Sequence, residues 1–322
     1  MNRTFGIELE IVSINRQTAL RALRAVDINV QDEFYNHSTR SHWKLVSDAS
    51  VHGGFEVVSP VLRGEAGIEE AMTVAVALDD AGATVNRSCG FHVHFDAGDL
   101  SAQDVRTIVK RYSTHEAEID AVMPPSRREN ANTYCASVSR FLGPSFNRAE
   151  TIHDLAAVQG GRYYKVNLQA YQCHGTIEFR QHSGTVNATK VANWVRFLGE
   201  FIDACKAAAA PAPAVPVMEH PAITGVQGRL AEMFAADGAV TLAAICERFG
   251  WQRHTARAAV TRLRHVGLRI SPVKVNGQSA YRLDSGLMAR AAASQVTESL
   301  WSGISESVIR FYRQRAAVLA AV

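Results

Sequence analysis

The stretch Phe5-Gly6-Ile7-Glu8-Leu9-Glu10 decides the fold, because acidic and apolar side chains alternate along it. Three later stretches repeat the pattern: Gly54-Phe55-Glu56-Val57-Val58-Ser59-Pro60, Cys89-Gly90-Phe91-His92-Val93-His94-Phe95-Asp96 and Thr176-Ile177-Glu178-Phe179-Arg180-Gln181-His182. Side chains at i and i+2 of a strand point to the same face of a sheet. We therefore expect one sheet surface to carry the polar side chains of Glu8, Glu10, His92, His94, Asp96, Glu178, Arg180 and His182, with apolar neighbours on the packed face.

Apolar spacing predicts the elements around these motifs. Strands are expected at 4–13, 43–46, 54–58, 92–95, 163–168 and 176–181, and helices at 16–26, 68–81 and 190–208. A further helix should begin after Ser101 as N-cap, with Asp104 in its first turn, and run toward Ile119. Residues 123–146 are polar and should be irregular. The order predicts an α+β fold in which a mostly antiparallel sheet is flanked by helices.

Composition narrows the class of protein. The 322 residues can hold two domains, and a net charge of +3 does not by itself imply a nucleic-acid partner. The five cysteines are scattered without a CxxC pair, which argues against a disulfide framework and a structural zinc knuckle. We expect no signal peptide before the first motif, and no apolar run approaches the roughly 20 residues of a membrane helix. We expect a soluble cytoplasmic protein with no membrane partner.

Domain boundaries follow from a composition shift. Residues 207–223 are rich in alanine and proline, which favours an extended linker over a packed element. We predict a catalytic domain at 1–206, a winged-helix-like domain at 224–285 and a helical segment at 286–322. The apolar face of that last segment, around Trp301 and Tyr312, should cover an interface or close the second domain.

The polar residues of the first domain point to metal and anion chemistry. Glu8, Glu10, Glu56 and Glu178 are hard oxygen ligands that suit Mg²⁺ or Mn²⁺. His92-Val93-His94 also suits zinc, although either histidine could be a buried structural residue. Arg180 can clamp a phosphate or simply pair with Glu178, and Arg162 and Lys165 lie just upstream. Neither GxxxxGK[ST] nor GxGxxG occurs at a strand–helix junction, so P-loop and Rossmann nucleotide sites are not supported.

The four motifs together resemble the amidoligase family, which comprises carboxylate–amine ligases related to glutamine synthetase and glutamate–cysteine ligase. Phe5 to Glu10 resembles its opening block, and Trp43 to Asp48 with Glu56 to Pro60 its second. The third is Cys89 to Asp96, and the fourth is Lys165 to Leu168 with Thr176 to His182. The resemblance implies a sheet that cups ATP and divalent cations, and an ATP-dependent joining of a carboxylate to an amine through an acyl phosphate.

That resemblance assigns roles to the residues. The metal ligands would be Glu8, Glu10, Glu56, His94 and Glu178; the catalytic residues Arg180, Glu178 and His94; and the ATP contacts Arg162, Lys165, Arg180 and His182. His92, Asp48 and His182 would orient these groups or contact substrate, and the family pattern is not strict at Asp96. The partners would be a carboxylate and an amine carried by small molecules, peptides or proteins.

Two other functions remain open on the sequence. One is a metal-dependent hydrolase built on His92, His94 and Asp96, and the other is a DNA-binding regulator whose N-terminal sheet senses a ligand.

Residues 224–285 have a signature of their own. Short helices precede a hairpin around Asn276-Gly277, a strong turn signal, and this order predicts a winged helix-turn-helix. Trp251 to Arg257 resembles a small winged-helix family associated with phages and bacteria. Between Arg229 and Asp284 there are nine basic and four acidic residues, a net charge of +5. The segment could contact nucleic acid through phosphates, with Arg253, Arg257, Arg262 and Arg264 on or near its recognition helix, or else contact protein or present substrate.

Overall fold

The computed structural model describes residues 1–209, 239–265, 270–275, 278–283 and 299–320, together with Val226, Arg229, Leu230, Met233 and Phe234. The chain divides into two compact units, Met1–Ala210 with Glu298–Val322, and Pro211–Thr297. The second unit is therefore inserted between two segments of the first.

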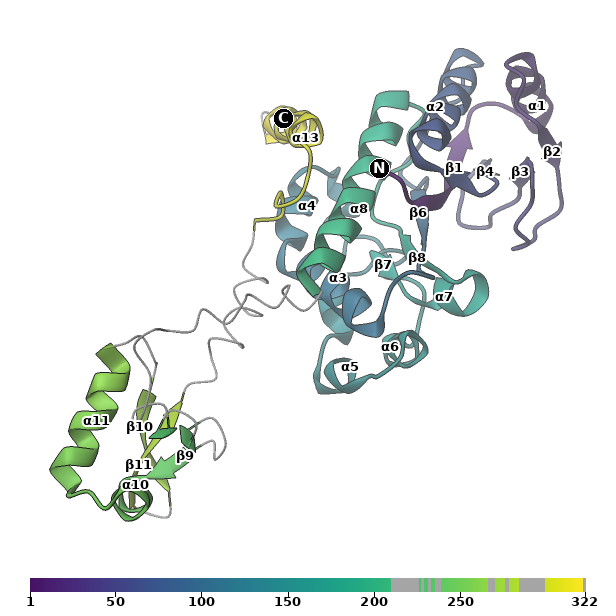
Figure 1. Ribbon diagram of the computed structural model, residues 1–322. Helices are drawn as coiled ribbons and strands as arrows, with labels where there is room; N and C mark the ends of the chain where they lie inside the picture. Colours follow the sequence, from purple (N-terminus) through teal and green to yellow (C-terminus); the bar gives the residue numbers. More distant parts are fainter. Residues whose placement is uncertain are drawn as a thin grey trace. The chain divides into compact units, whose positions relative to one another are not determined.

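The first unit is built on an eight-stranded sheet with the strand order β2-β3-β4-β1-β6-β8-β7, in which β5 also pairs with β1 (Figure 1). The strands are β1 (Thr4–Val12), β2 (Val30–Asp32), β3 (Trp43–Val46), β4 (Gly54–Val58), β5 (Leu62–Arg63), β6 (Phe91–Asp96), β7 (Val166–Asn167) and β8 (Thr176–Phe179). All neighbours are antiparallel except β2 and β3, which are parallel. The predicted mostly antiparallel α+β fold is confirmed.

Helices cover the apolar face of this sheet. They include α1 (Arg16–Ala25), α2 (Gly64–Asp80), α3 (Ala102–Thr114) and α8 (Ala188–Ala209), and α8 lies against both α2 and α3 (Figure 1). Strand residues such as Leu9, Val93 and Phe179 are fully buried in the same hydrophobic core as Val74 of α2 and Trp194 of α8. The acidic face is left on the opposite side of the sheet.

Local signals explain where several helices begin and end. Ser101 and Asp104 form the capping box that starts α3, with the Ser101 Oγ 3.1 Å from the Asp104 amide nitrogen. Gly82, just beyond α2, has φ +86°, a conformation that glycine adopts without strain. The expected continuous helix to Ile119 is wrong. The backbone leaves helical geometry at His115 (φ −104°, ψ 13°), and a separate helix, α4 (Glu116–Ala121), follows.

The second half of the first unit holds short elements. Two 3₁₀ turns, η1 (Pro125–Arg127) and η2 (Val138–Phe141), and helix α5 (Pro144–Arg148) occupy the predicted irregular stretch, and α6 (Ile152–Gln159) follows. Strands β7 and β8 are shorter than predicted, and helix α7 (Gln169–His174) lies between them. Helix α8 also continues three residues into the predicted linker, because the alanines there favour helix. The rest of that linker lies outside the described residues.

The described C-terminal segment belongs to the first unit. Helix α13 (Glu306–Ala320) places Val308, Ile309 and Tyr312 in the core that contains Trp194 and Phe197 of α8. The Arg315 Nε donates a hydrogen bond of 2.7 Å to the Val122 carbonyl oxygen. The idea that this segment closes the second domain is therefore wrong, because its apolar face packs on α8.

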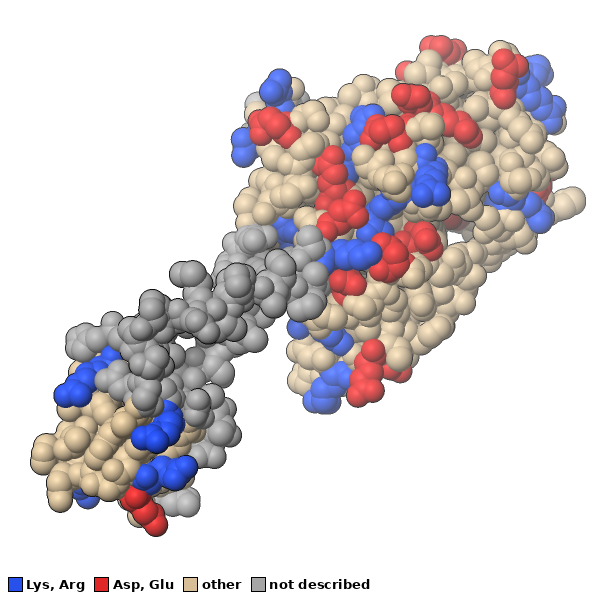
Figure 2. Space-filling view, in the orientation of Figure 1, with Lys and Arg blue, Asp and Glu red and all other residues tan. Residues whose placement is uncertain are grey.

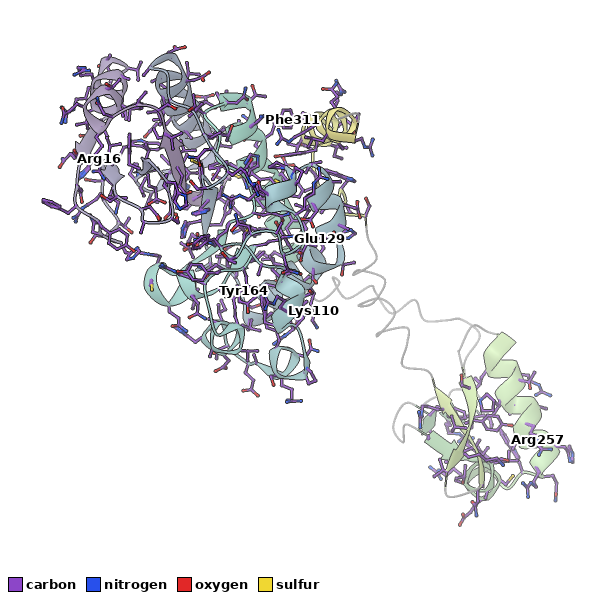
Figure 3. The ribbon with its side chains drawn as sticks, turned by 180° about the vertical axis from the view of Figure 1, so that it is seen from behind. Arg16, Lys110, Glu129, Tyr164, Arg257 and Phe311 are labelled. Atoms are coloured by element: carbon purple, nitrogen blue, oxygen red, sulfur yellow. The ribbon has the colours of Figure 1, made fainter. Side chains whose placement is uncertain are left out.

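The second unit contains β9 (Ala239–Thr241), α10 (Leu242–Phe249), α11 (Arg253–His265), β10 (Ile270–Val275) and β11 (Gln278–Leu283). Its antiparallel sheet has the order β10-β11-β9, and Leu242, Ile245, Val260, Leu263 and Ile270 are buried in its core. Lys and Arg predominate over Asp and Glu on its visible described surface (Figure 2). The side chain of Arg257 points away from the sheet (Figure 3). The predicted turn at Asn276-Gly277 lies outside the described residues.

Within the described part of the chain, no helix is both long and apolar enough to cross a membrane.

Candidate metal and ligand site

The polar side chains of β1, β4, β6 and β8 meet on one face of the sheet because of the strand register. Glu8 lies opposite His92 on β6, and Glu10 lies opposite Glu56 on β4. His94 in turn lies opposite Glu178 on β8. The alternation along four strands distant in sequence therefore produces one continuous polar surface.

The two histidines lie between the carboxylates. The His92 Nδ1 is 3.0 Å from Glu8 Oε2 and 3.6 Å from Glu178 Oε1. The other ring nitrogen of His92 is 3.7 Å from Glu10 Oε1. The His94 Nε2 is 3.4 Å from Glu8 Oε1 and 3.8 Å from Glu178 Oε1. Both imidazoles thus lie close to the same two carboxylates, Glu8 through its two different oxygens and Glu178 through Oε1.

Three overlapping groups in this face have the spacing of a metal site, since the ligand atoms in each lie within 4.8 Å of one another. They are Glu8, Glu56 and His92; Glu8, His94 and Glu178; and Glu10, Asp48 and Glu56. Oxygen ligands about 2.0–2.6 Å from one cation are separated by no more than about 5 Å, so this spacing fits a bound divalent ion. Glu8 and Glu56 each belong to two groups and could bridge neighbouring ions.

The carboxylates differ in protonation because their neighbours differ. Burial, together with the charges of Glu8, Glu10 and Asp48, raises the pKa of Glu56 well above its usual value. Burial acts in the same sense on Glu8, but hydrogen bonds and charge from His92 and His94 hold its pKa well below the usual value. Burial disfavours the protonated His94 ring, yet Glu178 and Glu8 raise the pKa of His94. Without a cation, the raised pKa values of Glu56 and His94 favour proton binding at this face, because a proton on either group offsets negative charge.

A second layer of contacts fixes the candidate ligands. The Gly90 amide donates to Glu10 Oε2 at 2.6 Å, and the Asn167 amide donates to Glu178 Oε2 at 2.6 Å. The His94 Nδ1 lies 3.0 Å from the Thr176 hydroxyl. Each contact leaves at least one other ligand atom facing the site, as in metal centres whose ligands are held from behind.

Arg180 lies beside the ligand groups at the end of β8. Its Nη1 donates to Glu178 Oε1, and its Nε donates to the Tyr134 carbonyl oxygen at 3.3 Å. The Tyr134 and Tyr163 rings meet edge to face at 5.3 Å, and the exposed Arg162 lies over the Tyr163 ring at 5.2 Å. The two arginines therefore contact neighbouring residues, Arg162 through the Tyr163 ring and Arg180 through the Tyr134 carbonyl oxygen.

The structure does not bring Lys165 to this site. Its ammonium is fully buried and donates to Glu116 Oε1 at 2.6 Å and Asp120 Oδ1 at 2.7 Å. A cation paired with two carboxylates of α4 is a structural element of the core, and the geometry gives no support to the expected ATP contact.

His182 is also absent from the polar face, because β8 ends at Phe179 and the alternation ends with it. The His182 ring packs between Phe91 and Trp194, with centroid distances of 5.5 and 5.3 Å. Its Nδ1 lies 2.6 Å from the Ser183 carbonyl oxygen, and burial lowers the pKa of His182 to about 3. It is a neutral core histidine rather than a group facing the site.

Asp96, which the hydrolase alternative requires, stands apart from the ligand groups. It is exposed at the end of β6 and accepts a hydrogen bond of 3.2 Å from the Gly98 amide. Among the described residues, none of the three groups with metal spacing includes it.

Sequence reasoning missed Lys44 and His174. Lys44 lies opposite Val58 in the register, is 4% exposed, and donates to the carbonyl oxygens of Asn36 (3.1 Å) and Ser38 (2.8 Å). It thereby anchors the loop after β2, and its position between Trp43 and Leu45 is a signal that alternation could have revealed. His174 of α7 lies edge to face with His94 at 6.1 Å, and no pattern marked it.

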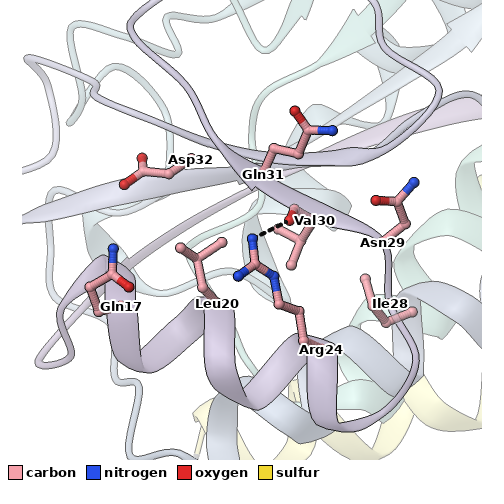
Figure 4. A pocket seen from close by; sticks show the side chains of 8 residues that line it. All are labelled: Gln17, Leu20, Arg24, Ile28, Asn29, Val30, Gln31 and Asp32. Atoms are coloured by element: carbon pink, nitrogen blue, oxygen red, sulfur yellow. Dashed lines mark hydrogen bonds between the residues drawn. The ribbon is translucent and has the colours of Figure 1, made fainter.

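A surface pocket of about 650 Å³ lies elsewhere, between α1 and β2 (Figure 4). The Arg24 Nη2 donates to the Val30 carbonyl oxygen at 3.1 Å beside it. Its lining contains none of the candidate ligands and consists of Gln17, Leu20, Arg24, Ile28, Asn29, Val30, Gln31 and Asp32.

Comparison with known proteins agrees with the division of the chain. Residues 224–283 match a family described as "Protein of unknown function (DUF3489)". No curated protein matches the chain. Residues 1–202, which contain every candidate ligand, match a family model described as "Putative amidoligase enzyme". The chain therefore belongs to the amidoligase family.

Proposed function

We propose that this protein is an ATP-dependent carboxylate–amine ligase that forms an amide bond through an acyl phosphate. Membership of the amidoligase family supports amide-bond formation. The observation that carries the finer proposal is the set of three overlapping ligand groups that share Glu8 and Glu56.

The donor set fits Mg²⁺ or Mn²⁺. Most of the ligand atoms are carboxylate oxygens, which these hard cations prefer. Glu56 is buried against other acids, and the His94 Nε2 faces two of the carboxylates, 3.4 Å from Glu8 Oε1 and 3.8 Å from Glu178 Oε1. When bound, the cations would neutralise the triphosphate and the charge that develops on the transferred phosphoryl group. Glu8, Glu10, Asp48, Glu56, His92, His94 and Glu178 would hold them.

The reaction needs two displacements. A carboxylate oxygen attacks the γ-phosphorus of ATP, the bond to the β,γ-bridging oxygen breaks, and ADP leaves. The amine nitrogen then attacks the acyl carbon, phosphate leaves, and the nitrogen loses a proton. Phosphoryl transfer depends on positioning and charge neutralisation rather than on a protein nucleophile, and the site offers those two contributions.

Arg180 is the residue best placed to contact the transferred phosphoryl group. Its guanidinium is oriented by Glu178 and by the Tyr134 carbonyl oxygen. Arg162, over the half-exposed Tyr163 ring, extends the positive charge at the rim, where planar guanidinium groups can bind phosphate. We place the nucleotide at this end of the site. Neither Lys165 nor His182 takes part.

The test is an ATP-consumption screen with the full chain, Mg²⁺, and pools of carboxylates and amines, followed by mass spectrometry of condensation products. ADP release should require the amine and the metal. Arg180→Lys keeps the charge but not the planar fork and should lower kcat by at least about tenfold, a loss typical of a transition-state contact. The matched control is Arg21→Lys, an exposed arginine on α1. Condensation without nucleotide, or equal rates for both variants, would contradict the proposal; zinc-dependent hydrolysis without ATP would replace it with the hydrolase.

A further inference from the structure

Helix α11 of the second unit presents two distinct kinds of side chain. Ala256, Ala259, Val260 and Leu263 are buried at helical spacing and fix the helix on the sheet. The opposite face carries His254, Ala258 and Thr261, all exposed. At 100° per residue these three form a strip along the helix, and their side chains are small or polar.

Arginines flank that strip. Arg253 and Arg257, four residues apart, lie along one side of it, and Arg262 lies along the other. All three are exposed, and Arg257 projects away from the three-stranded sheet (Figure 3). The face of α11 therefore has small or polar side chains along its middle and arginines along both edges. This arrangement is complementary to a groove whose two edges are lined by phosphates.

The hairpin adds positive charge. Lys274 of β10 and Arg282 of β11 are exposed. Among the side chains that the structure describes in this unit, one is acidic, Glu247, and seven are basic: Arg229, Arg248, Arg253, Arg257, Arg262, Lys274 and Arg282. The basic excess is therefore a property of the whole described surface, and on α11 it surrounds a strip of small or polar side chains.

We propose that the second unit is a winged helix-turn-helix that binds duplex DNA, with α11 in the major groove. A helix about 10–12 Å across fits a major groove about 12 Å wide, provided that its leading face lacks bulky side chains. Ala258 and Thr261 satisfy that condition. Arg257 and Arg262 then reach phosphates on opposite strands, and the β10–β11 hairpin contacts the flanking backbone.

A protein partner fits this surface less well. Protein interfaces are usually centred on large apolar or aromatic anchors. Among the described residues of this unit, the exposed large apolar side chain is Val226, which lies outside α11. Phe249 and Trp251 stack on each other at 4.7 Å and pack against the core.

The test is fluorescence anisotropy of the full chain with a labelled duplex of about 20 base pairs, at several salt concentrations. Each lost phosphate contact should change the slope of log K against log[salt] by about 0.9. We expect micromolar binding, and we expect the Arg257→Ala/Arg262→Ala variant to reduce that slope by about 1.8 and to weaken binding by at least about tenfold near 0.1 M salt. Arg310→Ala/Arg313→Ala, which removes two exposed arginines from α13, is the control and should bind like the wild type.

A second variant separates groove entry from general attraction. Ala258→Trp keeps the charge and lies on an exposed position, so it should fold, yet it should weaken duplex binding by at least about tenfold because it blocks the approach of α11. The proposal is overturned by any of four results: no duplex binding near 50 mM salt, equal affinity for single-stranded DNA, wild-type affinity of Ala258→Trp, or equal losses in the two double-arginine variants.

Discussion

The replacement His182→Phe tests the role of this histidine as a neutral residue of the core. The wild-type ring packs between Phe91 and Trp194 and is 1% exposed. Phenylalanine is apolar, cannot titrate, and suits an aromatic contact on both sides. The substitution therefore removes the ionisable group while keeping much of the packing.

The magnitude follows from the pKa of His182, which is lowered from 6.5 to about 3. Burial is the main cause, and positive charge from Arg315 of α13, Lys190 of α8 and Arg127 of η1 acts in the same direction, while the hydrogen bond to the Ser183 carbonyl opposes it. Between pH 6.5 and about pH 3, the histidine is protonated in the unfolded chain but neutral in the folded protein. Stability contributed by the neutral ring is therefore complete above about pH 6.5 and is lost as the pH falls toward 3.

At pH 5 that loss amounts to about 2 kcal/mol relative to pH 7.5, because the unfolded histidine is by then almost fully protonated. For a unit of this size it corresponds to a fall in Tm of about 4–8 °C. Urea unfolding of wild type and His182→Phe at both pH values isolates the effect, since all other histidines contribute equally to both proteins. The wild type should lose about 2 kcal/mol more than the variant.

Two results would refute this reasoning. One is an identical pH dependence in the two proteins. The other is loss of ATP turnover in a His182→Phe variant that remains folded at pH 7.5. That result would indicate that His182 contacts the nucleotide after all. If the variant fails to fold, NMR of the wild type decides, because the His182 ring resonances should not titrate between pH 7.5 and about 5.

Three further predictions concern the site and its support. Glu56→Gln should raise the unfolding free energy of the metal-free protein by about 1 kcal/mol or more near neutral pH, because the raised pKa of Glu56 makes the folded protein hold a proton that the unfolded chain releases and glutamine has no such cost, and it should abolish stabilisation by Mg²⁺ in thermal melts; an unchanged response to Mg²⁺ would argue against the ligand set. Lys165→Met should cost about 3–5 kcal/mol in urea unfolding, since it leaves two buried carboxylates of α4 unpaired; a stable but inactive variant would contradict the structural role. Gly90→Ala would place its Cβ 2.6 Å from the His92 Nε2, so Mg²⁺ should stabilise this variant less than the wild type; an equal increase in Tm would show that His92 does not need its present position.

The strand pattern predicted the site well where the strands persist. Glu8, Glu10, Glu56, His92, His94 and Glu178 share one face because β1, β4, β6 and β8 pair in regular antiparallel register. Successive side chains of a strand point to opposite faces because of the backbone geometry, so the alternation does not depend on how the side chains pack. The apolar residues between the ligands are buried in the core as expected.

The prediction failed where local structure changed within a motif. His182 follows Glu178 at strand spacing, but β8 stops at Phe179 and the ring turns into the core. Lys165 precedes the two-residue strand β7 and pairs with α4, a partner 45 to 49 residues away in sequence. Neither event has a signal in a single sequence, because both depend on long-range packing. His174 was missed for the same reason, since α7 places it next to His94.

The first unit has two buried clusters of charged residues, one around Lys165 and one on the polar face of the sheet, and only the second requires a ligand. Around Lys165 the acids are satisfied internally. The ammonium contacts both carboxylates, the Ser137 hydroxyl donates to Glu116, and the Gln181 amide donates to Asp120. Such a cluster is complete without any outside group.

On the open face the acids instead face one another. Glu8, Glu10, Asp48, Glu56 and Glu178 gather there with two fixed cations, Lys44 and Arg180, and the pKa of Glu56 is raised because burial and neighbouring acids disfavour its charge. A cluster of this kind destabilises the fold unless it serves a bound partner. The partner that would relieve it is a divalent cation, and a triphosphate would then compensate the charge that such cations bring. The excess of carboxylates on these four strands is thus the strongest physical argument that this face serves to bind divalent cations, as the proposed ligase requires, rather than to stabilise the fold.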